Sequence, residues 1–359
     1  MAERPLDRSQ AFAHRFGLGL PLLMAPMAGA SPVALAAAVA NAGGMGAAGA
    51  LLLEPADIAR WVSDFRLQTP GPLQLNLWVP DPTPVRDARH EAALRQFLAG
   101  FGPQVPAAAG DAAPPDFDAQ CLAVLQARPA AVSTIMGLLP AAWVQRFRAA
   151  GVAWFATVTT PAEARLAEAA GADVVVAQGA EAGGHRGCFD ASRGRDDAVG
   201  LFALLPQVVD AVRVPVVAAG AVADGRGVAA ALMLGASAVQ VGTALLTSPE
   251  AGISAAWAQA LPGLAATDTR LTQAFSGRWA RAIGNAYVRA AAAADAPAPA
   301  PYPVQRGLTA AMRREAEQAG DLQRLQAWAG QAAVLCSPGE PAAVWVQRVW
   351  GEARGLLRA

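Results

Sequence analysis

The chain of 359 residues contains no lysine, since all 28 of its basic residues other than histidine are arginine. This absence excludes the phosphate-binding loop G-x-x-x-x-G-K-[ST], which requires a lysine side chain. Acidic residues also number 28, so the formal net charge is zero. That balance predicts no nucleic-acid or other polyanionic partner.

Cysteine is scarce, with Cys121, Cys188 and Cys336 the only three. An odd number at such wide spacing indicates neither a disulfide framework nor a zinc cluster, and no metal site is expected. Long hydrophobic runs are also absent, and residues 1–20 carry charges without the apolar core of a signal peptide. We therefore expect a cytoplasmic protein with no membrane partner. The sequence does not define an oligomeric state.

What the chain does contain is a regular alternation of strand and helix patterns. Hydrophobic residues make up 54% and charged residues 16%, which is typical of a packed globular enzyme. The predicted strands are 20–25, 44–51, 74–78, 130–136, 154–158, 174–178, 214–218 and 238–241. Eight strands with helical crossovers predict an α/β fold of the (β/α)₈ TIM-barrel type.

We expect the barrel to occupy residues 14–248, with a proline-rich excursion at about 79–129 that is a candidate lid. Ser31 is predicted to cap a helix with Pro32 in its first turn. Residues 249–359 are expected to be helical, with a low-complexity linker at 291–303, and to cover the barrel mouth. The tryptophans of this region, including Trp328, are expected to be packing residues.

The most distinctive segment is 172–190, a buried strand that breaks into a loop in which four glycines surround His185. Glycine lets a backbone approach a ligand closely, and His185 is the side chain there that can exchange protons near neutral pH. A barrel strand would deliver this histidine to the catalytic rim. The alternative is a glycine-rich surface loop with an incidental histidine.

Two later loops, 218–222 and 240–243, follow the seventh and eighth predicted strands and consist largely of small residues. Loops at these positions of a TIM barrel commonly bind phosphate through free backbone N–H groups. The segment GGMGAAG at 43–49 superficially matches a dinucleotide fingerprint, but the acidic residue that should follow it is not evident. A mononucleotide, FMN, is therefore the expected cofactor.

Five ordered motifs together resemble the nitronate monooxygenase family. They are APMAG at 25–29, the strand containing Asn76, AQGAEAGGHRG at 177–187, AAGAVADGRGVAAALMLGASAVQVGT at 218–243, and AFSGRWAR at 274–281. The resemblance covers most of residues 14–285. It implies an enzyme that oxidises alkyl nitronates or nitroalkanes with O₂ to carbonyl compounds and nitrite.

The resemblance also implies a set of site residues. The implied FMN contacts are Ala25, Pro26, Met27, Asn76, Gln178, Gly183, Gly184, Gly220, Gln240, Val241, Gly242 and Thr243. Gly220 and residues 240–243 would bind the phosphate, and His185 would act near the reactive face of the flavin. Ser276 resembles a further site residue of the family, or caps a helix. At the fourth strand the sequence departs from many relatives, and only Thr134 there offers a hydrogen bond.

Two roles for His185 follow from its chemistry. As a neutral imidazole it can remove a proton from a nitroalkane, and as an imidazolium it can pair with a nitronate. Rival readings of the whole chain are an FMN-dependent enoyl-acyl-carrier-protein reductase or another NAD(P)H-dependent flavin oxidoreductase, and a flavin-binding barrel without turnover. The AFSGRWAR motif and the C-terminal extension favour the monooxygenase.

Overall fold

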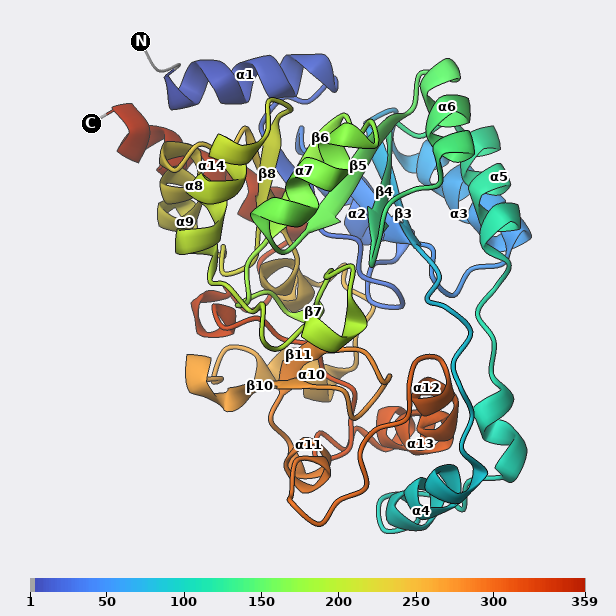
Figure 1. Ribbon diagram of the computed structural model, residues 1–359. Helices are drawn as coiled ribbons and strands as arrows, with labels where there is room; N and C mark the ends of the chain where they lie inside the picture. Colours follow the sequence, from blue (N-terminus) through green and yellow to red (C-terminus); the bar gives the residue numbers. More distant parts are fainter. Residues whose placement is uncertain (1–3, 359) are drawn as a thin grey trace.

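The computed structural model describes residues 4–358, in which eight parallel strands form one sheet in the order β1-β9-β8-β6-β5-β4-β3-β2. These strands are β1 (Leu22–Met24), β2 (Gly46–Gly49), β3 (Leu73–Trp78), β4 (Ala131–Ile135), β5 (Ala153–Val158), β6 (Val174–Gln178), β8 (Val216–Ala219) and β9 (Ala238–Val241). A parallel bridge between Leu23 and Met45 joins the first strand to the segment leading into β2. The sheet thereby closes, and the predicted TIM barrel is confirmed (Figure 1).

Eight helices pack around the strands. They are α2 (Val33–Asn41), α3 (Pro55–Gln68), α5 (Phe117–Ala127), α6 (Ala141–Ala149), α7 (Pro161–Ala169), α8 (Leu201–Ala211), α9 (Gly225–Met233) and α14 (Ala342–Arg358). The last helix packs between α9 and α2 and completes the ring. The C-terminal region is therefore not a uniform cover that begins at 249. Residues 248–341 are an insertion between the eighth barrel strand and its helix.

Side-chain caps fix the starts of several ring helices. Thr160 accepts a hydrogen bond from the Glu163 N–H at the start of α7, and Asp224 caps α9 in the same way. Ser31 does not cap α2, contrary to expectation. Pro32 occupies the N-cap position, and the Ser31 hydroxyl donates instead to the Met27 carbonyl at 2.8 Å.

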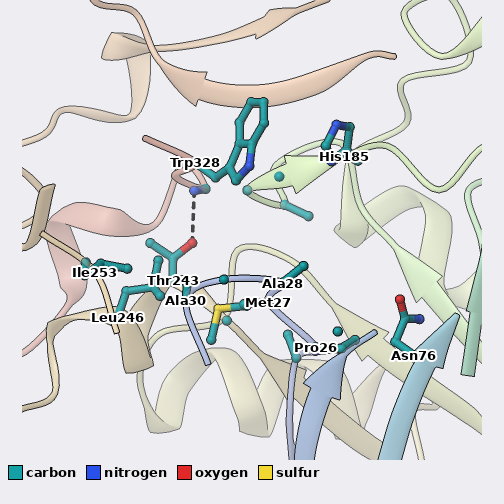
Figure 2. Close-up of a pocket in the computed structure, with 18 of the residues that line it drawn as sticks. Pro26, Met27, Ala28, Ala30, Asn76, His185, Thr243, Leu246, Ile253 and Trp328 are labelled. Carbon is teal, nitrogen blue, oxygen red and sulfur yellow. Dashed lines mark hydrogen bonds between the residues drawn. The ribbon is translucent and has the colours of Figure 1, made fainter. Parts of the chain in front are cut away.

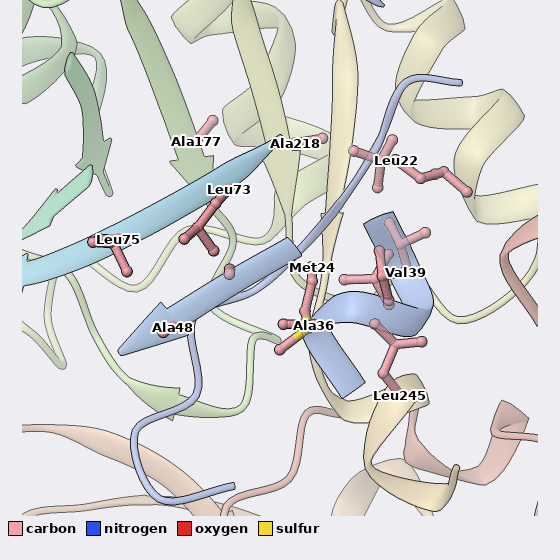
Figure 3. Close-up of a cluster of buried hydrophobic side chains, with 14 of the residues drawn as sticks. Leu22, Met24, Ala36, Val39, Ala48, Leu73, Leu75, Ala177, Ala218 and Leu245 are labelled. Carbon is pink, nitrogen blue, oxygen red and sulfur yellow. The ribbon is translucent and has the colours of Figure 1, made fainter. Parts of the chain in front are cut away.

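The core follows the two-residue period of the strands. Outward-facing Leu22, Met24, Leu73 and Leu75 pack against the ring helices, in the cluster that Figure 3 shows around Ala36 and Val39. Inward-facing Leu23, Phe155, Val176 and Val217 fill the barrel itself. Helix α1 (Pro5–Arg15) closes the N-terminal end of the barrel, where Phe12 contacts Phe155.

A cap lies beyond the carboxyl ends of the strands, on the side opposite α1 (Figure 1). Its helices and strands are β7 (Gly184–His185), α4 (Ala88–Leu98), α10 (Ala255–Ala260), β10 (Thr269–Thr272), β11 (Ala280–Ile283), α11 (Ala286–Ala291), α12 (Val304–Leu308) and α13 (Ala310–Ala319). Short 3₁₀ turns are η1 (Ala107–Asp111), η2 (Ala191–Arg193), η3 (Thr243–Thr247), η4 (Ala266–Asp268) and η5 (Ala333–Leu335). Among the described residues, no helix is long and apolar enough to cross a membrane.

The cap has its own hydrophobic cluster, built from both excursions of the chain. Leu94 and Leu98 of α4 pack with Phe275, Tyr287 and Leu308 of the late insertion. The expectation that residues from 249 onward are helical was incomplete, because β10 and β11 form an antiparallel pair there. The segment 291–303 is not an exposed linker throughout, since Ala300 and Tyr302 are buried at its end.

Candidate active site

A cavity of about 470 Å³ lies between the barrel mouth and the cap. Its floor consists of strand ends and the loops that follow them, and its roof includes the loop around His185 and residues from the late insertion. Figure 2 shows His185 and Trp328 on the cap side, opposite Pro26, Met27 and Asn76. Every predicted cofactor residue except Val241 lines this cavity.

The two-residue strand period explains which side chains reach the cavity. Asn76, Gln178 and Gln240 face the interior near the carboxyl ends of their strands, and all three line the cavity. Val241, the next residue after Gln240, faces outward and is buried in the hydrophobic core. Thr134 likewise does not line the cavity, because its hydroxyl is buried and accepts a hydrogen bond from Trp154 Nε1 at 2.9 Å. The neighbouring Ile135 lines it instead.

The three amides are partly engaged by the protein. Asn76 Nδ2 donates to Ser133 Oγ at 3.0 Å, which leaves its oxygen without a partner among residues 4–358. Gln240 accepts from Gln74 through Oε1, and its Nε2 donates to no described side chain or backbone group. Gln178 braces the histidine loop, since its Nε2 donates to the His185 carbonyl at 2.9 Å. Polar edges of Asn76 and Gln240 therefore remain for a ligand.

Backbone N–H groups gather where the seventh and eighth barrel strands end. Gly220, Ala221, Val222 and Gly242 line the cavity, and within the described chain their N–H groups donate to nothing. Gly220 and Ala221 both have positive φ, at 103° and 54°. For alanine this conformation is unfavourable, and such strain is concentrated at ligand-binding sites. We call these N–H groups the N–H cradle, and such groups are typical of loops that bind anions.

Close packing surrounds this cradle. A Cβ atom at Gly183 would lie 2.6 Å from the Gly330 nitrogen and 3.0 Å from Thr243 Oγ1. Gly330 N–H donates to that Thr243 oxygen at 3.1 Å, the bond drawn in Figure 2. Glycine at 183 is therefore required for the late insertion to seat against the eighth-strand loop.

His185 is held over the barrel mouth by a small three-stranded sheet. It lies in β7, which pairs with β11 so that His185 is opposite Ala280. Arg186 N–H donates to the Trp279 carbonyl at 2.8 Å, and Arg281 Nε donates to the Ala180 carbonyl at 2.9 Å. Gly184 has a φ of 78°, which lets the chain turn into this pairing.

The surroundings of His185 keep its ring neutral. Burial lowers its pKa from 6.5 to about 3, helped by the positive charges of Arg306, Arg278 and Arg313. Its Nε2 atom lies 2.8 Å from the Ser276 hydroxyl oxygen, whereas Nδ1 has no hydrogen-bond partner among residues 4–358. The lowered pKa therefore disfavours the imidazolium form of His185.

Ser276 is buried and does not line the cavity. It lies in the turn between β10 and β11, and its oxygen also contacts the backbone N–H and carbonyl of Arg278, each at 3.3 Å. It caps no helix. Arg278 in turn pairs with Asp81 and donates to the Cys188 carbonyl, which ties the early excursion to the histidine loop.

Aromatic side chains that the sequence analysis did not assign to the site enclose His185. The ring centroids of Trp78 and Trp328 lie 4.7 and 5.0 Å from that of His185, and Tyr302 stacks on Trp78 at 4.9 Å. Trp328 is thus a cavity residue and not only a packing residue. Trp78 could have been found from its strand register two residues after Asn76, whereas Trp328 and Tyr302 are placed by the path of the insertion.

A TIM barrel whose last two strands end in backbone N–H groups without partners among residues 4–358, and which holds a histidine over its mouth, is typical of the class of barrel enzymes. Residues 12–344 match the family profile described as nitronate monooxygenase. The chain is 41% identical over 350 residues to a nitronate monooxygenase of Pseudomonas aeruginosa, covering 96% of this chain and 99% of the relative. A nitronate monooxygenase of Paraburkholderia phytofirmans is 39% identical over 325 residues, covering 89% of this chain and 88% of the relative.

Two solved structures are similar to this chain over nearly its whole length. A nitroalkane oxidase from Streptomyces ansochromogenes superposes with a TM-score of 0.87 at 36% identity, covering 96% of this chain and 99% of that one. FabK from Thermotoga maritima superposes with a TM-score of 0.77 at 27% identity, covering 97% of each chain. The chain belongs to the nitronate monooxygenase family and is a flavin oxidoreductase.

Proposed function

We propose that the protein binds FMN and oxidises alkyl nitronates, and nitroalkanes after deprotonation, with O₂ to carbonyl compounds and nitrite. The observation that carries this proposal is one continuous cavity that joins the N–H cradle of Gly220 and Gly242 to the neutral His185. The flavin would supply the electron transfer between substrate and O₂ that side chains cannot perform. The chain's own residues would bind the flavin, orient the substrate and deprotonate it.

Three features of the cavity support FMN as the cofactor. Unpartnered N–H groups after the seventh and eighth barrel strands match a single terminal phosphate. The free oxygen of Asn76 and the free Nε2 of Gln240 offer an acceptor and a donor to the polar edge of a flavin ring. The backbone of Ala25 to Met27 forms the adjoining cavity wall.

His185 is assigned as the base for neutral nitroalkanes. Because burial lowers its pKa, the ring is unprotonated at neutral pH and has a free nitrogen, Nδ1, for the proton that leaves the substrate carbon. The same lowering weakens the base, so the proton transfer needs stabilisation of the charge that develops on the substrate. The Ser276 hydroxyl can donate to the Arg278 carbonyl and accept from His185 Nε2, which selects the tautomer with a basic Nδ1. Ser276 is accordingly a positioning residue, while His185 contacts the substrate.

The test begins with the purified protein, which should be yellow. Heat or acid should release a flavin that chromatographs as FMN and not FAD. Nitrite should form from a nitronate in air. A colourless protein that FMN cannot reconstitute would contradict the cofactor, and anaerobic flavin reduction by NAD(P)H without response to any nitronate would assign a reductase.

A further inference from the structure

One arginine of the cavity has no partner among residues 4–358. Arg306 of α12 lines the cavity and is half-buried, yet across residues 4–358 its side chain makes no hydrogen bond and no ion pair. Other arginines of limited exposure have partners: Arg278 and Arg348 pair with carboxylates, and the buried Arg186 and Arg281 donate to backbone carbonyls. Arg306 therefore stands out.

A second guanidinium lies beside it without a carboxylate. Arg313 lines the same cavity and donates to the Arg306 carbonyl at 2.9 Å and to Gln326 Oε1. Burial, and then the charge of Arg306, lowers the pKa of Arg313 to about 10. The acidic residue of the cavity lining, Glu317, is exposed and forms no ion pair with a described residue. Like charges that are desolvated together are costly unless a ligand supplies the counter-charge.

Arg306 lies in the same cavity as His185, the proposed base. Burial lowers the pKa of Arg306, as it does that of His185, and the charge of Arg306 further lowers the His185 pKa. Tyr302, which precedes helix α12, stacks on Trp78, whose ring contacts His185. Arg306 and His185 line the same cavity, so an anion bound by Arg306 would share that cavity with the histidine.

We propose that Arg306 binds the two oxygens of the substrate's nitro or nitronate group. This inference rests on the proposed function. A nitronate is planar with two oxygens, and a guanidinium fork suits such a group as it suits a carboxylate. When the substrate C–H bond breaks, the proton passes to His185 Nδ1, and the electron pair delocalises onto the oxygens that Arg306 holds. A preformed nitronate already carries this negative charge on its oxygens when it binds.

The test compares Arg306→Gln and Arg306→Lys with a matched control, Arg354→Gln, which removes an exposed arginine of α14 that does not line the cavity. We expect Arg306→Gln to raise KM for a simple alkyl nitronate at least about 10-fold, with partial recovery in Arg306→Lys, as for the loss of a charge-assisted hydrogen bond. Nitrate, an inert planar oxyanion, should bind to Arg306→Gln at least about 10-fold more weakly than to the parent protein, as measured by tryptophan fluorescence. Arg354→Gln should change both values little.

Several outcomes would overturn the assignment. Loss of bound flavin in Arg306→Gln would make Arg306 a cofactor ligand. An effect confined to nitronates that carry a second anionic group would place Arg306 against the substrate's tail. Nitrate affinity equal in parent and Arg306→Gln would also contradict it. Nitrate binding that depends on Arg306 in a protein that oxidises no nitronate would instead reject the proposed function and retain an oxyanion site.

Discussion

The Nε2 atom of His185 lies 2.8 Å from the hydroxyl oxygen of Ser276, although the two residues are 91 positions apart in the chain. The histidine comes from the loop after the sixth strand, and the serine from a hairpin in the insertion after the eighth. Their contact means that the base of the proposed reaction is oriented by the cap and not by the barrel alone.

Replacing His185 by Asn should separate the two substrate forms. Turnover of a neutral nitroalkane should fall on the order of 10² to 10⁴-fold, because a base is needed only while the C–H bond is intact. Turnover of the preformed nitronate should fall much less. Nitrite and flavin absorbance, followed for both forms side by side, provide the measurement. Equal activity of variant and parent on the nitroalkane would refute His185 as base.

Replacing Ser276 by Ala should slow nitroalkane turnover while leaving KM nearly unchanged. The loss should be on the order of 10 to 100-fold, because the ring loses the partner that fixes its tautomer and orientation. Ser276→Thr, which keeps the hydroxyl, is the control. Retention of full kcat by Ser276→Ala would show that the hydrogen bond has no role in catalysis.

The pH dependence of kcat/KM for a neutral nitroalkane should show no loss from His185 protonation between about pH 7 and about pH 5. The sign follows from the lowered pKa: with a value of about 3, the basic form persists well below the ordinary value of 6.5. Initial rates with freshly diluted nitroalkane measure this. A fall in activity with a midpoint near 6.5 would mean that His185 titrates normally.

Asp81 should contribute strongly to stability through its pair with Arg278. The Arg278 side chain is only 2% exposed, so Asp81→Asn would leave an uncompensated buried charge. We expect a loss of about 3 to 5 kcal/mol in the free energy of unfolding. Asp7→Asn, which removes an exposed pair with Arg4, should cost less than about 1 kcal/mol. Chemical denaturation of both variants would show whether the two losses differ.

Two glycines should respond to alanine with opposite signs. Gly183→Ala places a Cβ against the backbone of 329–330, so melting temperature and flavin retention should fall together. Gly351 lies in the exposed face of α14 with nothing within 4 Å of a Cβ. Gly351→Ala should raise the free energy of unfolding by roughly 0.5 to 1 kcal/mol, because alanine is the better helix former. A destabilised Gly351→Ala would contradict the described packing of that helix.

The barrel could be predicted from sequence because each strand carries its own signal, a short run of small or β-branched residues. The positions of Asn76, Gln178 and Gln240 at the cavity could be predicted from the barrel, because strand ends meet at one rim and every second residue of a strand faces inward. The same alternation, applied strictly, would have removed Val241 from the cofactor set.

The cap could not be predicted in the same way. β7 has only two residues, and its pairing with β11 joins segments almost a hundred residues apart. Local pattern carries no information about such a contact. Arg306 and Trp328 reach the cavity only because the insertion returns across the barrel mouth, and neither lies in a local motif that indicates a site.

The position of α14 in the helix ring has a consequence for how the protein is made. This helix fills the gap between α9 and α2, and the insertion of residues 248–341 lies between β9 and α14 in the chain. The first and last barrel strands can pair early, but their outer face stays exposed to solvent until residues 342–358 have been synthesised. A chain that stops before α14 would retain every residue that lines the cavity and still present an open apolar seam beside α2. Such a fragment should aggregate, and its loss of activity would say nothing about the active site.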